Sequence, residues 1–342
     1  MQTTATIAIF MGLTMSSTFV MMSNNWLLAW LNLEMNTLAV LPVISKTKHP
    51  RAIEASTKYF LTQTIASCLL LFSCTTNAWY TGTWSITQMD DTYTSTMMLV
   101  ALTMKAGTTP THFWLPEVMQ GSTLITTVLM STWQKIAPLT LIFSMSNHAS
   151  PNIALMLGLL STTFGGWGGM NQTQLRKMMA YSSIANMGWT VMILTSQPKA
   201  SMISIFTYVL TVIPTIFMME LTSTKTLQNM TTSWSTSPTT STTLTLLLLS
   251  TAGLPPLTGF IPKLLILNEL VTQNLTPAAV AAATASLLSL IFYLRTAYLT
   301  ALLNTPSSAT STMKWRQKIK TKATILTPTA LTAMTMLPAM TK

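Results

Sequence analysis

The sequence predicts an all-α polytopic membrane protein, with residues 1–342 forming a single membrane domain. Only 7% of the residues are Asp, Glu, Lys or Arg, and the mean hydropathy is +0.47. Apolar stretches follow one another with short polar breaks, and most approach the ~20 residues that cross a bilayer as a helix. A soluble protein would carry many more charges, and a β-barrel would need segments of about ten residues with alternating hydrophobicity. Both classes are therefore excluded.

The apolar stretches predict about eleven transmembrane helices, each near the ~20 residues of a span. We place these helices at residues 3–22, 26–45, 57–75, 94–121, 122–146, 151–171, 178–196, 200–222, 241–272, 277–302 and 323–341. When successive helices alternate in direction, the basic clusters of the loops all fall on one face. Basic loops stay on the side of synthesis, so the N-terminus is expected on this positive face and the C-terminus on the opposite one. The net charge of +11 then reflects topology, and no nucleic-acid partner is expected.

Two of the expected helices, 94–121 and 241–272, are too long and too interrupted to be ordinary spans. The interrupting residues are Gly107, Pro110 and Pro116 in the first helix, and Gly253, Pro255, Pro256, Gly259 and Pro262 in the second. Proline removes a backbone donor and clashes with the preceding turn. Broken backbone at membrane depth persists only where it is buried in protein or lines a wet cavity. We therefore expect two discontinuous helices, the alternative being that the prolines only kink helices for packing.

The two breaks lie about 145 positions apart, in the fourth and the ninth of the expected helices. Because the step between them is an odd number of helices, the two halves should have opposite orientations. This predicts two inverted five-helix repeats, 1–146 and 150–302, each containing a broken helix. Paired broken helices in inverted halves are typical of transporter cores.

Three further segments are polar or rich in glycine, two of them within the second repeat and one after it. Residues 223–240 are expected to form a loop, and residues 303–322 form a basic loop on the positive face before a C-terminal helix at 323–342. The basic loop is expected either to lie on anionic headgroups such as those of cardiolipin or to be a plain solvated loop. The run FGGWGGM at 164–170 predicts close helix packing, because it lacks the strand–turn–helix context of a nucleotide-binding fingerprint.

Four ionisable residues interrupt membrane-length apolar segments: Glu34, Lys105, Lys135 and Lys263. A lysine at the bilayer centre costs roughly 2.5–3.5 kcal/mol on insertion scales, and the commonest reason for such a residue is a proton or ion path. Two purely structural interpretations stay open: Glu34 belongs to a polar pair that packs helices together, and the Lys135 side chain snorkels to water. His112, inside the first break, is either a relay member, since histidine titrates near neutral pH, or a structural histidine.

The two lysines beside the breaks are expected to meet opposite ends of a helix dipole. Lys105 ends the first half of its broken helix, where exposed carbonyls favour a cation. Lys263 follows Pro262 at the start of a second half, where the dipole disfavours a cation. Cys68 and Cys74 lack the spacing of metal ligands, and neither a phosphate-binding loop nor a haem-type histidine pair occurs. We therefore expect no metal or cofactor site on this chain.

Three long motifs carry a family resemblance: KAGTTPTHFWLPEVMQGS (105–122), NQTQLRKMMAYSSIANMGW (171–189) and AGLPPLTGFIPK (252–263). The chain resembles, from end to end, the mitochondrially encoded antiporter-like subunits of respiratory complex I, the NADH–ubiquinone oxidoreductase. The resemblance implies a place in the proton-pumping arm in the mitochondrial inner membrane, with the N-terminus on the matrix side and the C-terminus on the intermembrane-space side. It also implies an antiporter-like fold of two inverted five-helix repeats.

The resemblance further implies a role for each buried charge. The family's glutamate matches Glu34, the lysine before its first break matches Lys105, its central lysine matches Lys135, and the lysine after its second break matches Lys263. By analogy Glu34 tunes Lys105, and charge passes through Lys135 to Lys263 along a wet mid-membrane axis. The family often has histidine where this chain has Asn186, which orients water but carries no proton.

The resemblance implies partners as well: the other membrane-arm subunits, including adjacent antiporter-like and small membrane subunits, and the lipid bilayer. The FMN, the iron–sulfur clusters and the quinone chemistry of the family belong to other subunits. Two other functions stay open from the sequence. A self-contained cation/proton antiporter would exchange ions without partners, and a non-transporting scaffold would keep its activity when the buried charges are neutralised.

Overall fold

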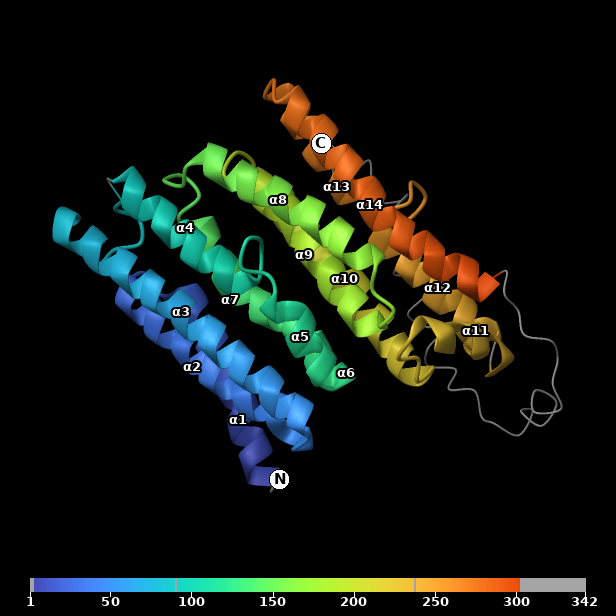
Figure 1. The fold of residues 1–342 in the computed structure, drawn as a ribbon. Helices are drawn as coiled ribbons and strands as arrows, with labels where there is room; N and C mark the ends of the chain where they lie inside the picture. Colours follow the sequence, from blue (N-terminus) through green and yellow to red (C-terminus); the bar gives the residue numbers. More distant parts are fainter. Residues whose placement is uncertain (1–2, 90, 237, 302–342) are drawn as a thin grey trace. The chain divides into compact units, whose positions relative to one another are not determined.

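The structure is a computed structural model that describes residues 3–89, 91–236 and 238–301. Within these ranges the chain is all-helical, and the extended backbone is limited to two isolated bridges, Asn25 to Ser85 and Gln174 to Thr226. The α-helices are numbered α1 to α14 along the chain (Figure 1). The expected basic loop 303–322 and C-terminal helix 323–342 lie outside the described residues.

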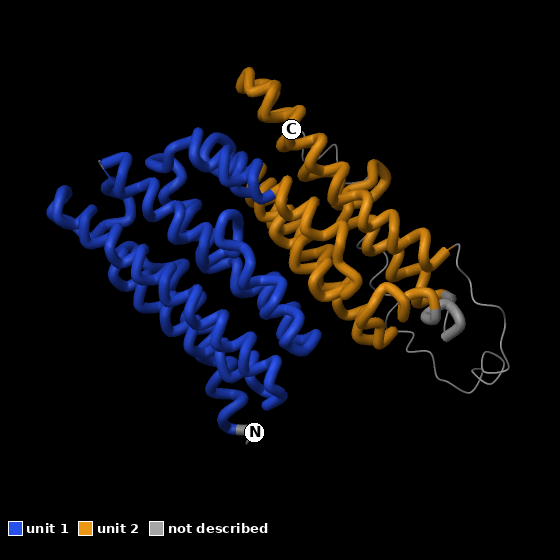
Figure 2. The backbone as a smooth tube through the Cα atoms, in the orientation of Figure 1, with its two compact units in different colours: residues 1–161, 190–199 blue, residues 162–189, 200–342 orange. Residues whose placement is uncertain are grey.

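The chain divides into two compact units, which Figure 2 colours separately. Unit 1 comprises residues 1–161 and 190–199, and unit 2 comprises residues 162–189 and 200–342. The inverted repeats 1–146 and 150–302 stay a prediction.

Unit 1 is built on α3, a long helix that packs against α2, α4 and α5. Its helices are α1 (Thr3–Met22), α2 (Trp26–Ile44), α3 (Pro50–Thr81), α4 (Thr92–Ala106), α5 (Trp114–Gly121), α6 (Leu124–Ser131) and α7 (Trp133–Ser144). Pro50 occupies the first turn of α3, where its missing N–H is not needed, and Gly82 ends α3 with φ +70. The buried side of α3 recurs every three to four residues, as in Tyr59, Gln63 and Ala66, so one face of the helix meets its neighbours.

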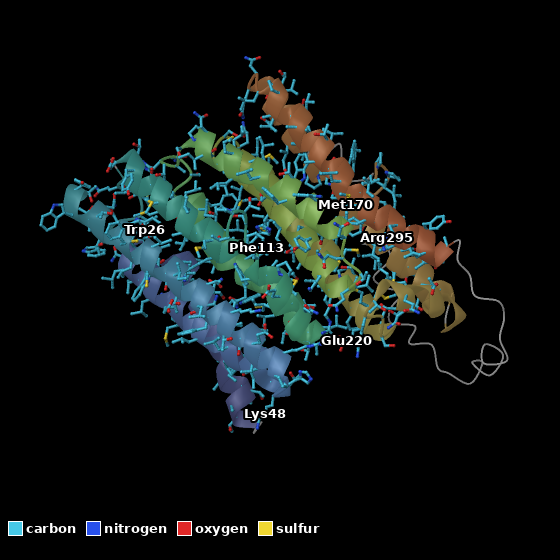
Figure 3. The ribbon with its side chains drawn as sticks, in the orientation of Figure 1. Trp26, Lys48, Phe113, Met170, Glu220 and Arg295 are labelled. Atoms are coloured by element: carbon cyan, nitrogen blue, oxygen red, sulfur yellow. The ribbon has the colours of Figure 1, made fainter. Side chains whose placement is uncertain are left out.

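Unit 2 gathers its helices around α14, which contacts α11, α12 and α13. The helices that lie wholly or partly in this unit are α8 (Pro151–Met170), α9 (Leu175–Leu194), α10 (Pro198–Leu221), α11 (Leu227–Thr236), α12 (Pro238–Ala252), α13 (Phe260–Thr272) and α14 (Thr276–Ala301). The guanidinium of Arg295 on α14 donates to the carbonyl of Met170, the last residue of α8, at 3.2 Å. Figure 3 labels both residues.

The glycine run 164–170 packs closely against neighbouring helices of unit 2, as its composition predicts. A Cβ placed at Gly165 would lie 2.7 Å from the backbone nitrogen of Ala185 on α9. A Cβ at Gly166 would lie 2.8 Å from Leu288 on α14. Real Cβ contacts are longer than this, so the two helices approach α8 only because these positions carry no side chain.

Both predicted discontinuous helices are broken in the structure. The segment 94–121 forms α4 and α5, and the segment 241–272 forms α12 and α13. The first half of each ends at an alanine followed by a glycine in the left-handed region, Gly107 with φ +81 and Gly253 with φ +82. The second half of each begins seven positions after that glycine, at Trp114 and at Phe260. The two breaks therefore share one local design.

Two sequence expectations about continuity are wrong. The helix expected at 122–146 is interrupted between α6 and α7 at Thr132, where both the backbone N–H and the hydroxyl donate to the Val128 carbonyl, at 3.0 and 2.8 Å. Such side-chain back-bonding competes with the helix ladder and bends it. The loop expected at 223–240 contains α11, because Leu227 and Met230 are buried one turn apart and fix a short helix that the polar composition concealed.

Among the described residues, six helices are long and apolar enough to cross a bilayer: α1, α2, α3, α8, α10 and α14. The halves of the broken helices are shorter than a full span. The number of eleven transmembrane helices stays a prediction, and the coarser expectation of an all-α architecture holds for the described part of the chain.

Candidate functional site

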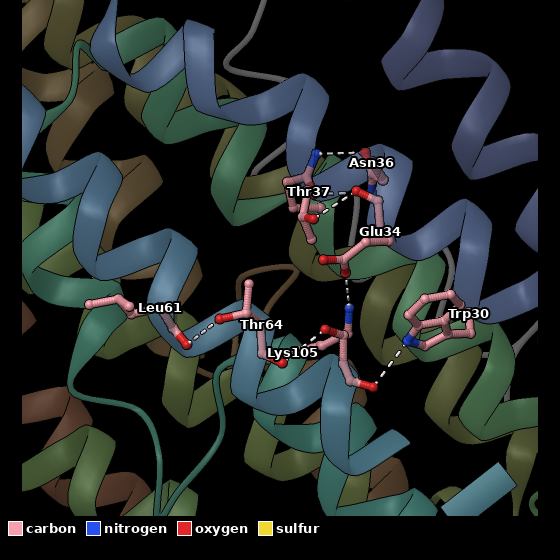
Figure 4. Close-up of polar contacts among 9 residues, drawn as sticks. Trp30, Glu34, Asn36, Thr37, Leu61, Thr64 and Lys105 are labelled. Carbon is pink, nitrogen blue, oxygen red and sulfur yellow. Dashed lines mark hydrogen bonds and ion pairs between the residues drawn. The ribbon is translucent and has the colours of Figure 1, made fainter. Parts of the chain in front are cut away.

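The candidate site of unit 1 includes an ion pair between α2 and α4. The Nζ of Lys105, in the last turn of α4, lies 3.8 Å from the Oε2 of Glu34 on α2 (Figure 4). The Lys105 side chain is 3% exposed and the Glu34 side chain 25%. The distance exceeds that of a hydrogen bond, so the attraction is purely ionic. Glu34 and Lys105 thus lie close together, and the tuning of Lys105 by Glu34 stays a prediction.

The position of Glu34 is fixed by the packing of α2 on α3. One helical turn before Glu34, the indole N–H of Trp30 donates to the Ser67 carbonyl of α3 at 3.0 Å (Figure 4). Residues four apart share one helix face, so this bond turns Glu34 toward the same side. The Glu34 backbone carbonyl also accepts the Thr37 hydroxyl at 2.8 Å. Glu34 is therefore held at an angle that keeps its carboxylate near α4.

A small cavity lies beside this pair within unit 1. Both Lys105 and Lys135 line it, and Lys135, on α7, is only 2% exposed. The remaining polar side chains of the wall are Asn36, Thr37, Tyr59, Gln63 and Gln134. Two of the four predicted charges thus share one polar cavity, which is the arrangement that proton movement between them requires.

An amide pair in this cavity wall escaped the sequence analysis. The Asn36 Nδ2 donates to the Gln134 Oε1 at 3.1 Å, and the Gln134 Nε2 donates to the Asn36 Oδ1 at 3.2 Å. The two residues lie 98 positions apart, on α2 and α7, so no periodicity within a helix could have joined them. The only available signal was the rarity of amides inside apolar segments.

Lys263 forms the centre of a second site, in unit 2. It lies on α13 and its Nζ donates to the carbonyl of Ala252, the last residue of α12, at 2.6 Å. The expectation that the ammonium meets an unfavourable helix dipole is therefore wrong. A helical side chain leans toward the N-terminus of its own helix, so the Lys263 stem crosses the break and reaches the carbonyl end of α12, where the dipole favours a cation.

Gly253 makes room for this contact. A Cβ at this position would lie 3.1 Å from the Lys263 Cδ and 2.9 Å from the Gly259 carbonyl oxygen. Its φ of +82 is also in the left-handed region that side chains disfavour. The glycine thus serves both the turn of the backbone and the passage of the lysine stem.

A small cavity adjoins the Lys263 site. Its wall also includes Asn186 on α9 and a group of hydroxyl side chains, Ser204, Thr207, Tyr208, Thr211 and Thr251. The Asn186 Nδ2 donates to the Ser182 carbonyl at 3.0 Å. The described residues in this wall include no carboxylate, so the lysine is surrounded by neutral groups that can orient water.

His112 lines neither of these two cavities. It is 5% exposed within the first break, and its ring stacks on that of Phe113 with 4.2 Å between centroids. Its role as a relay member stays a prediction. A separate charge cluster occurs on α3 and α5, where Lys58 lies 2.5 Å from both Glu54 and Glu117. These three side chains are 40 to 59% exposed, so their ion pairs contribute little.

The fold and the sites together define a class: a polytopic helical membrane protein with two broken helices, each associated with a buried lysine and a polar cavity. The family model described as "NADH:quinone oxidoreductase/Mrp antiporter, TM" matches residues 23–289. The chain therefore belongs to the NADH:quinone oxidoreductase/Mrp antiporter family.

Curated relatives and solved structures agree with this assignment. The chain is 47% identical to the NADH-ubiquinone oxidoreductase chain 2 of Carassius auratus, over 89% of this chain and 88% of that protein. It is 49% identical to the protein of that name from Varanus timorensis, over 93% of this chain and 92% of the relative. A chain of respiratory complex I from Thermus thermophilus has a similar fold, with a TM-score of 0.83 at 23% identity over 96% of this chain and 78% of that chain. A chain of the Mrp complex from Dietzia superposes with a TM-score of 0.75 at 17% identity, over 88% of this chain and 64% of that chain.

Proposed function

We propose that this chain is a core membrane subunit of a proton-pumping NADH–ubiquinone oxidoreductase and that its buried charges translocate protons. The observation that carries the proposal is the Glu34–Lys105 pair at 3.8 Å, beside a polar cavity that Lys105 shares with Lys135. Intramembrane ionisable groups that pair with one another and face a cavity are typical of proton relays. Family membership and the curated relatives support the assignment to the oxidoreductase.

The chemistry of unit 1 is electrostatic. At 3.8 Å the attraction between Glu34 and Lys105 is on the order of 4 kcal/mol for an effective dielectric constant of about 20. Protonating or displacing Glu34 removes this attraction, so the energy of the charged Lys105 depends on its partner. A proton released by Lys105 enters the cavity whose wall includes Lys135. The pair and the cavity therefore couple a change in the charge or position of the Glu34 carboxylate to proton movement.

In unit 2 we assign the role of proton carrier to Lys263, whose ammonium donates to the Ala252 carbonyl at 2.6 Å. A charge-assisted hydrogen bond of this kind is stronger than a neutral one, so loss of the proton weakens the link between α12 and α13. Asn186 and the surrounding hydroxyls can orient water in the cavity, but they do not change their protonation near neutral pH. Lys263 is thus the titrating group proposed for this unit.

The proposed subunit has eleven transmembrane helices in two inverted repeats and lies in the mitochondrial inner membrane. Its N-terminus is on the matrix side and its C-terminus is on the intermembrane-space side. The partners are other membrane-arm subunits, and FMN and the iron–sulfur clusters lie on other chains. The cardiolipin-binding role of 303–322 falls outside the described residues.

The proposal is tested with Lys105→Ala and Lys263→Ala in the assembled complex, reconstituted in liposomes and driven by NADH and ubiquinone. Protons moved per electron should fall in both variants. Lys58→Ala is the matched control, because Lys58 is a lysine of unit 1 with an exposed side chain. An unchanged stoichiometry in Lys105→Ala and Lys263→Ala would show that these residues are structural.

Two alternatives make different predictions. A self-contained cation/proton antiporter is favoured by the fold shared with the Mrp complex chain, and the purified chain in liposomes would then exchange cations along a proton gradient. A scaffold would keep full pumping in all charge-neutralising variants and would lose assembly only when helix interfaces are altered. We expect no exchange by the isolated chain.

A further inference from the structure

The geometry points to Asn36 and Gln134 as a positioning pair that holds Lys135 for proton transfer in the unit 1 cavity. This inference rests on the proposed function. It concerns two neutral residues, which act through Lys135 and carry no charge themselves.

The first observation is that the pair is reciprocal and largely shielded from solvent, with Asn36 buried and Gln134 half-buried. Each amide donates to the other, at 3.1 and 3.2 Å, and Asn36 is 2% exposed. A side chain–side chain bond between two helices in an apolar interior is much harder to replace by water than a surface bond. The pair therefore fixes the distance between α2 and α7 at this level.

The second observation is the place of the pair along each helix. Asn36 follows Glu34 by two positions on α2, and Gln134 directly precedes Lys135 on α7. The pair thus connects the helix that carries the acid with the helix that carries the second lysine. Movement of α2 at Glu34 would be transmitted to the backbone of Lys135.

The third observation is that the backbone alone holds this part of α7 weakly. The helix is interrupted at Thr132, directly before α7 begins. Pro138 lies four residues after Gln134 and has no N–H to donate to the Gln134 carbonyl. The first turn of α7 is instead tied by side chains, through the amide pair and through the Trp133 indole, which donates to the Leu13 carbonyl of α1 at 3.5 Å.

The fourth observation is the chemistry of the amides. A primary amide has two donor hydrogens and two acceptor lone pairs, and the reciprocal pair uses one of each per residue. Both residues line the cavity that includes Lys105 and Lys135, as does Gln63 from α3. Neutral amides orient water in either direction and do not trap a proton, which suits a wall shared by two titrating lysines.

The test uses the assembled complex in liposomes and measures protons per electron together with thermal stability. Asn36→Leu and Gln134→Leu should lower protons per electron by about twofold or more, since a misplaced group near a reacting centre has effects of this size or larger. The matched control is Asn77→Leu, because Asn77 is also a buried amide of unit 1, 1% exposed, but its amide bonds to the Gln88 carbonyl at 3.1 Å and it is not in the cavity wall. This control should lower stability without changing protons per electron.

A length exchange separates positioning from packing. Asn36→Gln makes the pair one methylene too long, Gln134→Asn makes it one too short, and the double variant restores the sum. Each single variant should reduce protons per electron, and the double variant should recover most of the loss. The inference is overturned if the double variant is no better than the singles, or if Asn77→Leu lowers the stoichiometry as much as Asn36→Leu. Lys105→Ala is measured in parallel, so that an unchanged stoichiometry there identifies a failure of the proposed function itself.

Discussion

The Lys263 ammonium donates to the Ala252 carbonyl at 2.6 Å, so a side chain of α13 caps the end of α12 across the break. The two halves of the broken helix are thus joined by a side chain that is able to lose its charge. Loss of the proton would weaken the contact that holds the halves together. Four expected outcomes follow from this contact and from the geometry described above.

Lys263→Met should loosen the second break. The substitution removes the donor and leaves the Ala252 carbonyl buried without it, which costs about 1–3 kcal/mol. Hydrogen exchange of the amides at 253–259 in the assembled complex should therefore become faster. Lys199→Met is the control, since Lys199 is an exposed lysine at the start of α10. Unchanged exchange in Lys263→Met would show that the bond does not hold the break.

Gly253→Ala should reduce both stability and pumping, whereas Gly82→Ala should reduce stability alone. Both glycines have a positive φ, +82 and +70, and a side chain in the left-handed region costs roughly 1–2 kcal/mol. A Cβ at Gly82 meets nothing within 4 Å, but a Cβ at Gly253 would lie 3.1 Å from the Lys263 stem. Thermal denaturation and protons per electron, measured on both variants, distinguish the two. Equal pumping in both would contradict the positioning of Lys263 by Gly253.

Glu34→Gln should lower protons per electron, because it removes the carboxylate that lies 3.8 Å from the Lys105 ammonium while keeping the side chain's shape. Glu54→Gln is the matched control, because Glu54 is an exposed acid of unit 1 that pairs with Lys58 at the surface. The stoichiometry of proton movement to NADH oxidation is measured in both variants. A normal value in Glu34→Gln would mean that the ion pair only joins α2 to α4.

Gly165→Ala should impair assembly, whereas Gly12→Ala should be tolerated. The new Cβ would lie 2.7 Å from the Ala185 backbone nitrogen at Gly165 but 3.7 Å from the Ala39 Cβ at Gly12. Overpacking against backbone costs about 1–3 kcal/mol, while Ala in place of Gly inside a helix gains up to about 1 kcal/mol. The yield and melting temperature of the assembled complex measure the difference. A stable Gly165→Ala complex would show that α8 and α9 can separate at little cost.

The sequence predicted the features that depend on neighbouring residues. The breaks at Gly107 and Gly253 follow from local glycine and proline chemistry, so they were found at the right positions. Glu34, Lys105, Lys135 and Lys263 were singled out because a charge is rare inside an apolar segment. The structure places Lys105 beside Glu34 and in the wall of the cavity that includes Lys135. The same reasoning did not predict the interruption at Thr132 or the helix α11, because the local signals for helix and for loop are both weak in these segments.

The features that sequence reasoning missed arise from contacts between distant segments. The Asn36–Gln134 pair joins residues 98 positions apart, and neither residue has a pattern that identifies the other. The dipole argument for Lys263 considered only the helix that carries it, whereas its long stem reaches the end of the preceding half-helix. A flexible side chain of four methylenes is placed by the available space, and that space appears only in three dimensions.

Two of the buried lysines, Lys105 and Lys263, differ in the group that stabilises their charge. Lys105 has a carboxylate partner, whereas Lys263 has a backbone carbonyl and, among the residues that the structure describes, forms no ion pair. Seen from afar, opposite charges side by side act as a dipole, and their potential fades faster with distance than that of a single charge. A voltage across the bilayer, or an electron arriving elsewhere in the enzyme, would therefore act more strongly on Lys263 than on the Glu34–Lys105 pair.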